Sequence, residues 1–197
     1  MSKAQIVVVL LLVGAGLGSW FYTAAKPEGA DPGTEIPNFE LTNQAGETFG
    51  TEDLDGQLWI ASFLFTRCKA TCPALMVHLS GLQDALSDLE RVHIVSFSVD
   101  PEYDTAEVLA KQATAYGVDP DRWSLVTGPR DSIETLVVDH FRFAMERAEV
   151  DGMMAVAHTG NVVLVDGNHR VVDSYATTPE QLAALAAEVR SRVSRAP

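Results

Sequence analysis

Apolar positions along the chain follow two periods, and these periods predict the secondary structure. Nearly continuous apolar runs of strand length occupy 58–65, 92–99 and 123–127, a pattern typical of strands buried on both faces. Directly after the first run, apolar residues recur at three- and four-residue spacing. This spacing predicts a helix that continues to about residue 90.

Three later helices are predicted from their capping residues. Asp104, Asp131 and Thr178 are each followed three positions later by Glu or Gln, the pattern of a capping box. We therefore expect helices that begin at these three residues, the first of which ends near Gly117.

Two hairpins flank this alternation of strands and helices. Residues 39–42 and 48–49 enclose a turn with glycine, and residues 162–165 and 170–172 enclose Asp-Gly-Asn-His. Strands that alternate with helices favour an α/β sheet. A closing hairpin followed by a helix is how thioredoxin-like domains end. The predicted fold is thus α/β and thioredoxin-like, with an N-terminal β-hairpin.

The N-terminal segment is apolar enough to cross a membrane. Residues 4–25 carry no charged side chain, and about 20 such residues span a bilayer. We expect residues 1–25 to form a transmembrane anchor, residues 26–35 a flexible Pro- and Gly-containing linker, and residues 36–197 the folded domain. A cleaved signal peptide is the alternative. Either reading exports the domain, which we place in the periplasm, or an equivalent extracytoplasmic side, of the bacterial inner membrane.

Composition narrows the function. The formal net charge is −13 and no basic run occurs, which argues against nucleic acid as a partner.

Cys68 and Cys72 are the two cysteines of the chain and lie four positions apart, just after a predicted buried strand. At the start of a helix, backbone N–H groups favour thiolates, and Arg67 and Lys69 would act in the same direction. Such a pair can close a disulfide or bind a soft metal ion such as copper or zinc.

A third ligand would complete a metal site, and five histidines are available. His78 lies inside the first helix, His93 begins a strand, His140 ends a helix and His169 sits in a turn, so each has a structural interpretation. His158 differs, because it directly precedes a strand in the part of a thioredoxin-like chain that returns toward the cysteines. The residues alone leave its role open.

Three stretches together identify a resemblance. Residues 66–73 read T-R-C-K-A-T-C-P, residues 98–105 read S-V-D-P-E-Y-D-T, and His158 is followed by threonine. These stretches resemble the Sco/SenC family of copper-binding, thioredoxin-like proteins. The similarity runs from about Ile36 to the end of the chain. Ala157 departs from the aspartate that the family often has before the histidine.

The resemblance implies a function and a site. It makes Cys68, Cys72 and His158 the ligands of one copper ion, Cu(I) or Cu(II), in a membrane-anchored metallochaperone. Such a protein would receive copper from an upstream donor and deliver it to the dinuclear copper centre in subunit II of cytochrome c oxidase or to another acceptor. The alternative is a thiol–disulfide oxidoreductase that keeps the oxidase's copper-ligand cysteines reduced.

Other residues near these motifs have two interpretations each. Asp100 would either support the copper site and face a partner, or cap the end of a strand. Met145, Met153 and Met154 are soft donors that could pass copper, although scattered methionines are more often core or loop residues. A peroxidase of the peroxiredoxin type is disfavoured, because the residues before Cys68 lack the proline-to-threonine segment expected of that type.

Overall fold

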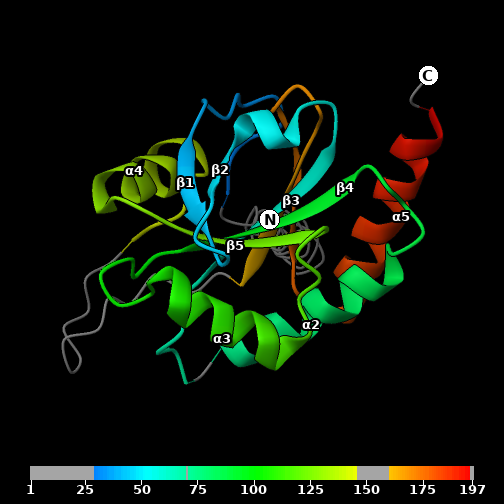
Figure 1. Ribbon diagram of the computed structural model, residues 1–197. Coiled ribbons are helices and arrows are strands. Elements are labelled where there is room, and N and C mark those ends of the chain that lie inside the picture. The colour runs from blue at the N-terminus through cyan, green and yellow to red at the C-terminus, as the bar shows by residue number, and fades with distance from the viewer. Residues whose placement is uncertain (1–28, 70, 146–159, 196–197) are drawn as a thin grey trace, which may run out of the picture.

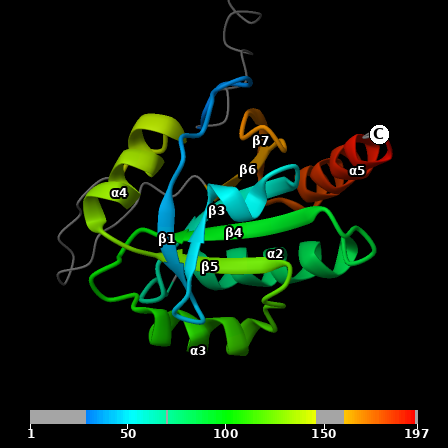
Figure 2. The same ribbon diagram turned by 45° about the horizontal axis from the view of Figure 1, so that its top comes forward.

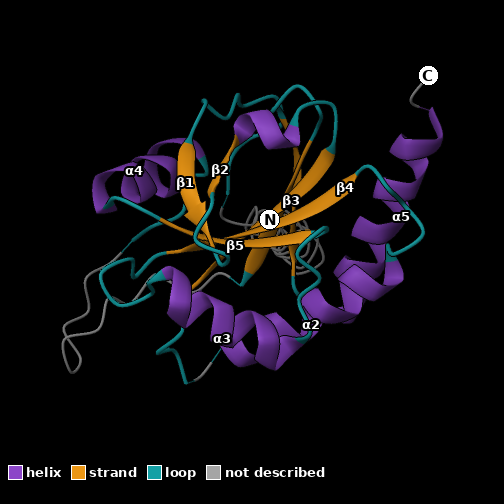
Figure 3. Cartoon of the chain, viewed as in Figure 1, coloured by secondary structure: helices purple, strands orange, loops and turns teal. Residues whose placement is uncertain are grey.

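Parallel and antiparallel strands share one sheet. The computed structural model of the chain describes residues 29–69, 71–145 and 160–195, and within them seven strands lie in the order β2-β1-β5-β4-β3-β6-β7 (Figures 1 and 3). The strands are β1 (Glu40–Asn43), β2 (Thr48–Gly50), β3 (Leu58–Leu64), β4 (Val92–Ser98), β5 (Trp123–Thr127), β6 (Asn161–Val165) and β7 (Val171–Ala176).

The three central strands are parallel, as their apolar runs predict. β3 pairs with β4 in register from Leu58↔Val92 to Leu64↔Ser98, and β4 pairs with β5. Every residue of β4 is buried, which explains why its sequence lacks the alternation of a half-exposed strand. Because parallel strands end at the same edge of a sheet, the segments that follow β3 and β4 lie next to each other.

Helices cover both faces of this sheet. Figure 2 shows α2 and α3 on one face and α4 on the other. Helix α5 packs against β7 and contacts α2. The helical elements are η1 (Thr51–Leu54), α2 (Cys72–Ala85), α3 (Ala106–Tyr116), α4 (Arg130–Glu134), η2 (Thr135–His140) and α5 (Pro179–Arg195).

Two of the predicted helix starts are wrong. Thr105, not Asp104, caps α3, since the Thr105 side chain accepts a hydrogen bond from the backbone N–H of Val108. Asp104 is withdrawn into the interior instead. Pro129, not Asp131, precedes α4, and this helix continues as the π-helix η2. Competing contacts elsewhere in the fold therefore override a local capping pattern.

The other predicted boundaries agree more closely. Helix α3 ends at Gly117, which adopts the left-handed conformation with φ +65° as a C-cap does. Thr178 caps α5 through a 3.4 Å hydrogen bond from the Gln181 N–H to its hydroxyl. Helix α2 ends at Ala85, five residues before the predicted end, and the apolar pattern continues through a turn that buries Leu86.

Residues before β1 lie along the edge of β7. The N–H of Gly33 donates to the carbonyl of Val171, and the N–H of Val171 donates to the carbonyl of Thr34. Ala30 and Ile36 are buried. This described part of the predicted linker is tied to the sheet rather than free. The predicted anchor, residues 1–25, lies outside the described residues, and none of the helices inside them is long and apolar enough to cross a membrane.

Several polar groups inside the sheet form hydrogen bonds between neighbouring strands. The Ser62 and Ser96 hydroxyls lie 2.7 Å apart, and the indole N–H of Trp123 donates to the Ser96 hydroxyl. His93 contacts the Ser124 hydroxyl at 3.0 Å through Nε2. His93 also stacks on the Phe49 ring. The structure thus confirms that His93 has a structural role in the core.

The burial of His93 predicts a pH dependence of stability. Desolvation lowers the pKa of His93 from 6.5 to about 4. Between these values the unfolded chain binds a proton that the folded chain does not, so stability falls as the pH falls. From pH 7 to pH 4.5 this residue should remove about 2–3 kcal/mol from the free energy of unfolding.

Urea unfolding at both pH values measures this loss. His93→Gln retains an amide that can donate to Ser124 but cannot take up the proton, so its stability should fall by about 2–3 kcal/mol less than that of the wild type. Equal losses in the two proteins would contradict the assignment.

Candidate metal site

The two cysteines meet where β3 passes into α2. Cys68 lies in the loop after β3, Cys72 is the first residue of α2, and both are buried and not disulfide-bonded. The backbone N–H of Cys72 donates to the sulfur of Cys68, with 3.4 Å between N and Sγ. The loop before α2, and not a shared helix face, therefore brings the Cys68 sulfur to the first residue of the helix.

The expected thiolate character does not hold for Cys72. Burial is the largest of the effects that raise the pKa of this thiol to about 12, and Cys68 and the Asp104 carboxylate raise it further. A hydrogen bond with the Phe65 backbone acts in the opposite direction but is outweighed. Cys72 is thus a neutral thiol at pH 7, since desolvation disfavours the charged form more than the helix start favours it.

Arg67 does not direct its charge at the sulfurs. Its guanidinium binds Asp100 through Nε at 2.8 Å and Nη2 at 2.5 Å, and it lies over the Tyr103 ring at 4.5 Å. Lys69 is exposed. Asp100 is almost fully buried. Its backbone N–H donates to the Ser98 hydroxyl at the end of β4, so Asp100 is both an ion-pair partner and a strand-end residue.

Asp104 joins the cysteine loop to the end of β4. Its side chain is fully buried, and its carboxylate accepts hydrogen bonds from the Thr66 N–H, the Thr66 hydroxyl at 2.5 Å and the Ser98 hydroxyl at 2.6 Å. Burial raises the pKa of this carboxyl above its usual value, and the same hydrogen bonds offset only part of that increase. Two residues before Cys68, the chain is therefore fixed to Asp104, 38 positions further along, and through Asp104 to the end of β4.

The sequence pattern did not identify this role of Asp104. Its position in the capping pattern of α3 assigned it to the helix start. A different signal was present, because hydroxyl residues follow β3 and end β4, the two strands whose ends meet beside Asp104. Buried carboxylates require donors, and Thr66 and Ser98 supply them.

The proposed third ligand is not among the described residues. His158 lies within 146–159, as do Ala157, Met153 and Met154, so their placement relative to the cysteines is untested. Within the described ranges, no group of three His, Cys, Asp or Glu side chains is arranged to hold a metal ion. Met145 packs against the core.

Within the described ranges, none of the remaining histidines belongs to a group of three side chains that could hold a metal ion. His169 lies in the turn between β6 and β7, where its Nε2 is 2.8 Å from Oδ1 of Asp55. Its side chain is partly buried. His140 is the last residue of η2, and His78 is half-buried on α2.

Comparison with known proteins identifies a matching family. The family model described as SCO1/SenC matches residues 27–194. A SCO1 protein homolog of Bacillus subtilis is 35% identical over 143 residues, which are 72% of this chain and 73% of the relative. The residues matched by the family model include both cysteines and the segment with Asp100 and Asp104.

Solved structures share the fold. One, of BsSco, is described as a member of the Sco family of cytochrome c oxidase assembly proteins with a disulfide switch. It is 28% identical, covers 85% of this chain and 98% of its own, and has a TM-score of 0.68. The structure of Bradyrhizobium japonicum ScoI with copper bound is 24% identical, covers 82% and 99%, and has a TM-score of 0.68, a likeness of fold. The predicted thioredoxin-like α/β fold is thereby confirmed.

The contact between Thr66 and Asp104 predicts the effect of an isosteric substitution. Thr66→Val removes a hydroxyl that donates to a buried carboxylate, so the free energy of unfolding should fall by about 2 kcal/mol. Thr66→Ser keeps the hydroxyl and should retain most of this stability. Urea unfolding at pH 7 measures both.

Thr127→Val is the matched control. The Thr127 hydroxyl is buried in β5 and has no hydrogen-bond partner in the described part of the chain, so its removal should cost less than about 0.5 kcal/mol. A loss in Thr127→Val as large as that in Thr66→Val would show that Asp104 does not hold the loop.

Proposed function

The chain belongs to the SCO1/SenC family, and we propose that it is a copper metallochaperone of cytochrome c oxidase assembly. It binds one copper ion as cargo and delivers it to the dinuclear copper centre of oxidase subunit II. The observation that carries this proposal is the pair of buried cysteines, not joined by a disulfide, in the loop before α2 and at its first residue. A relative of the same fold is described with copper bound.

The donor set fits copper. Two thiol sulfurs are soft ligands, which suit copper or zinc better than magnesium or calcium. His158 is proposed as the third ligand, since two sulfurs rarely complete a site. The choice of copper over zinc rests on the family rather than on the donor atoms.

The residues around the pair prepare it for a metal ion. Burial of Cys68 and Cys72 excludes water, and the hydrogen bonds of Asp104 to Thr66 fix the loop that leads to Cys68. The Arg67–Asp100 ion pair neutralises two charges beside this loop. Metal ligation by cysteine requires the thiolate, so binding releases protons, the Cys72 proton in particular.

The place of action is proposed from the sequence. Residues 1–25 anchor the protein in the bacterial inner membrane and expose the domain to the periplasm. An anchor confines the donor to the surface where a membrane-bound oxidase lies, and so raises its effective concentration there. The upstream copper donor is a further partner of this proposal.

A second candidate is thiol–disulfide exchange with the oxidase's copper-ligand cysteines. The hydrogen bond from the Cys72 N–H to the Cys68 sulfur favours it, because the two residues are already adjacent, and a relative is described with a disulfide switch. Closing the disulfide would release two electrons and two protons to the substrate disulfide. It would also remove both sulfur ligands.

Copper titration of the reduced protein tests the main proposal. The wild type should bind one Cu(I) with thiolate-to-copper absorption, whereas Cys68→Ser, Cys72→Ser and His158→Ala should each weaken binding at least 100-fold, a loss of about 2.7 kcal/mol. His140→Ala is the matched control and should bind as the wild type does.

The same variants separate the two candidates. If His158→Ala loses tight copper binding and still supports assembly of an active oxidase in cells, thiol exchange is the function and the chaperone proposal is wrong. If assembly is lost together with copper binding, while the dithiol of this variant still reduces a model disulfide, the chaperone proposal stands.

A further inference from the structure

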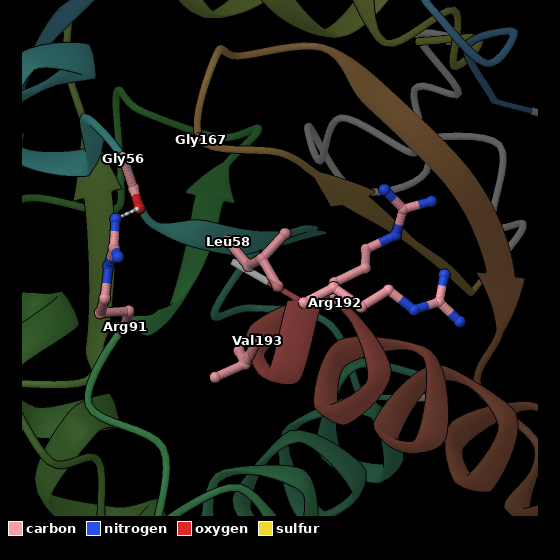
Figure 4. Close-up of a pocket in the computed structure, with 7 residues that line it drawn as sticks. Gly56, Leu58, Arg91, Gly167, Arg192 and Val193 are labelled. Carbon is pink, nitrogen blue, oxygen red and sulfur yellow. Dashed lines mark hydrogen bonds between the residues drawn. The ribbon is translucent and has the colours of Figure 1, made fainter. Parts of the chain in front are cut away.

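A pocket lies at the end of the sheet opposite the cysteines. It surrounds Leu58, the first residue of β3, whereas Cys68 follows the last residue of the same strand (Figure 4). Seven strand residues separate the two places by roughly 20 Å. The pocket has a volume of about 380 Å³, within the range of small-molecule sites. It is therefore distinct from the metal site.

Two glycines form one wall of the pocket. The N–H of Gly56 donates to the carbonyl of Gly167 at 3.1 Å, and a Cβ on Gly167 would lie 2.8 Å from two backbone atoms of Gly56. The close approach of these backbones excludes any side chain at Gly167. Leu58 and Val193 are partly buried and supply the apolar surface.

Three arginines surround this apolar surface. The Nη2 of Arg91 donates to the Gly56 carbonyl at 2.7 Å, which holds Arg91 against the glycine wall. Arg192 contacts Glu188 through Nε at 2.6 Å, and Arg195 ends α5. In the described part of the chain, neither Arg91 nor Arg195 has a carboxylate partner. Figure 4 shows Arg91 on one side of Leu58 and Arg192 on the other.

The charge of this pocket is opposite to that of the protein. The chain has 27 acidic and 14 basic residues, yet all three charged residues that line the pocket are basic. Glu188 neutralises one of them, so about two positive charges remain beside an apolar surface. Guanidinium groups pair well with carboxylates and phosphates.

We propose that this pocket binds a small organic anion, one that combines a carboxylate or phosphate group with an apolar body. The apolar body lies on Leu58 and Val193, and the anionic group pairs with the arginines at the rim. An inorganic anion would leave the apolar surface uncovered, and an uncharged molecule would leave the guanidinium groups without a counter-ion. Both should bind more weakly than a ligand with both parts.

Backbone-amide NMR of the 15N-labelled protein tests the proposal with three probes. Octanoate should give saturable shifts at Gly56, Leu58 and Gly167. Octanol, which lacks the charge, and inorganic phosphate, which lacks the apolar body, should each bind at least tenfold more weakly. Arg91→Gln and Arg195→Gln should each weaken octanoate binding about five- to tenfold; Arg195 is exposed, so its substitution leaves the fold intact.

Arg170→Gln is the matched control. Arg170 is an exposed arginine paired with Glu35 and does not line the pocket, so octanoate binding should be unchanged. Absence of saturable shifts, equal weakening in all three variants, or phosphate binding as strong as octanoate binding would each overturn the proposal. Copper binding by the pocket variants should equal that of the wild type, so a failure here is separate from a failure of the metal site.

Discussion

The position of the cysteine pair depends on one buried carboxylate. Asp104 accepts hydrogen bonds from the Thr66 backbone and side chain and from the Ser98 side chain, with no exposure to solvent. These contacts join the loop after β3 to the end of β4, two strands that are already parallel and in register. The loop that carries Cys68 is therefore fixed, through Asp104, to the end of β4. Burying a carboxylate without hydrogen-bond donors costs a large amount of free energy. Asp104 can therefore be buried here only because Thr66 and Ser98 donate to it.

This arrangement explains how the loop at the end of β3, an interior strand, holds two buried thiols. The segment after β3 turns back so that Cys72 begins α2, and the Cys72 N–H finds its acceptor in the Cys68 sulfur. Arg67, which could have stabilised a thiolate, is bound to Asp100 instead. Burial raises the pKa of Cys72 to about 12 and keeps this thiol neutral. The family and the soft donor atoms together support copper as the ion that this site receives.

The order of strands and helices and the closeness of the two cysteines could be predicted from the sequence, because both depend on residues that are near one another in the chain. Strand runs, hairpin turns and the spacing of Cys68 and Cys72 are properties of short segments. Asp104 was assigned to a helix cap because its true partner, Thr66, is 38 positions earlier. The charge state of Cys72 was misjudged for the same reason, since its burial comes from the packing of the whole domain. The arginine pocket could not be predicted either, because its lining comes from the loops before β3 and β4, the turn after β6 and the end of α5.

We propose that Cys68, Cys72 and His158 together hold one copper ion. X-ray absorption spectroscopy of the reduced protein with one equivalent of Cu(I) tests it most directly. We expect two sulfur ligands and one imidazole nitrogen in the wild type, and loss of the imidazole signal in His158→Ala with the sulfur ligands retained. A copper environment without imidazole in the wild type, or one that is unchanged in His158→Ala, would contradict it.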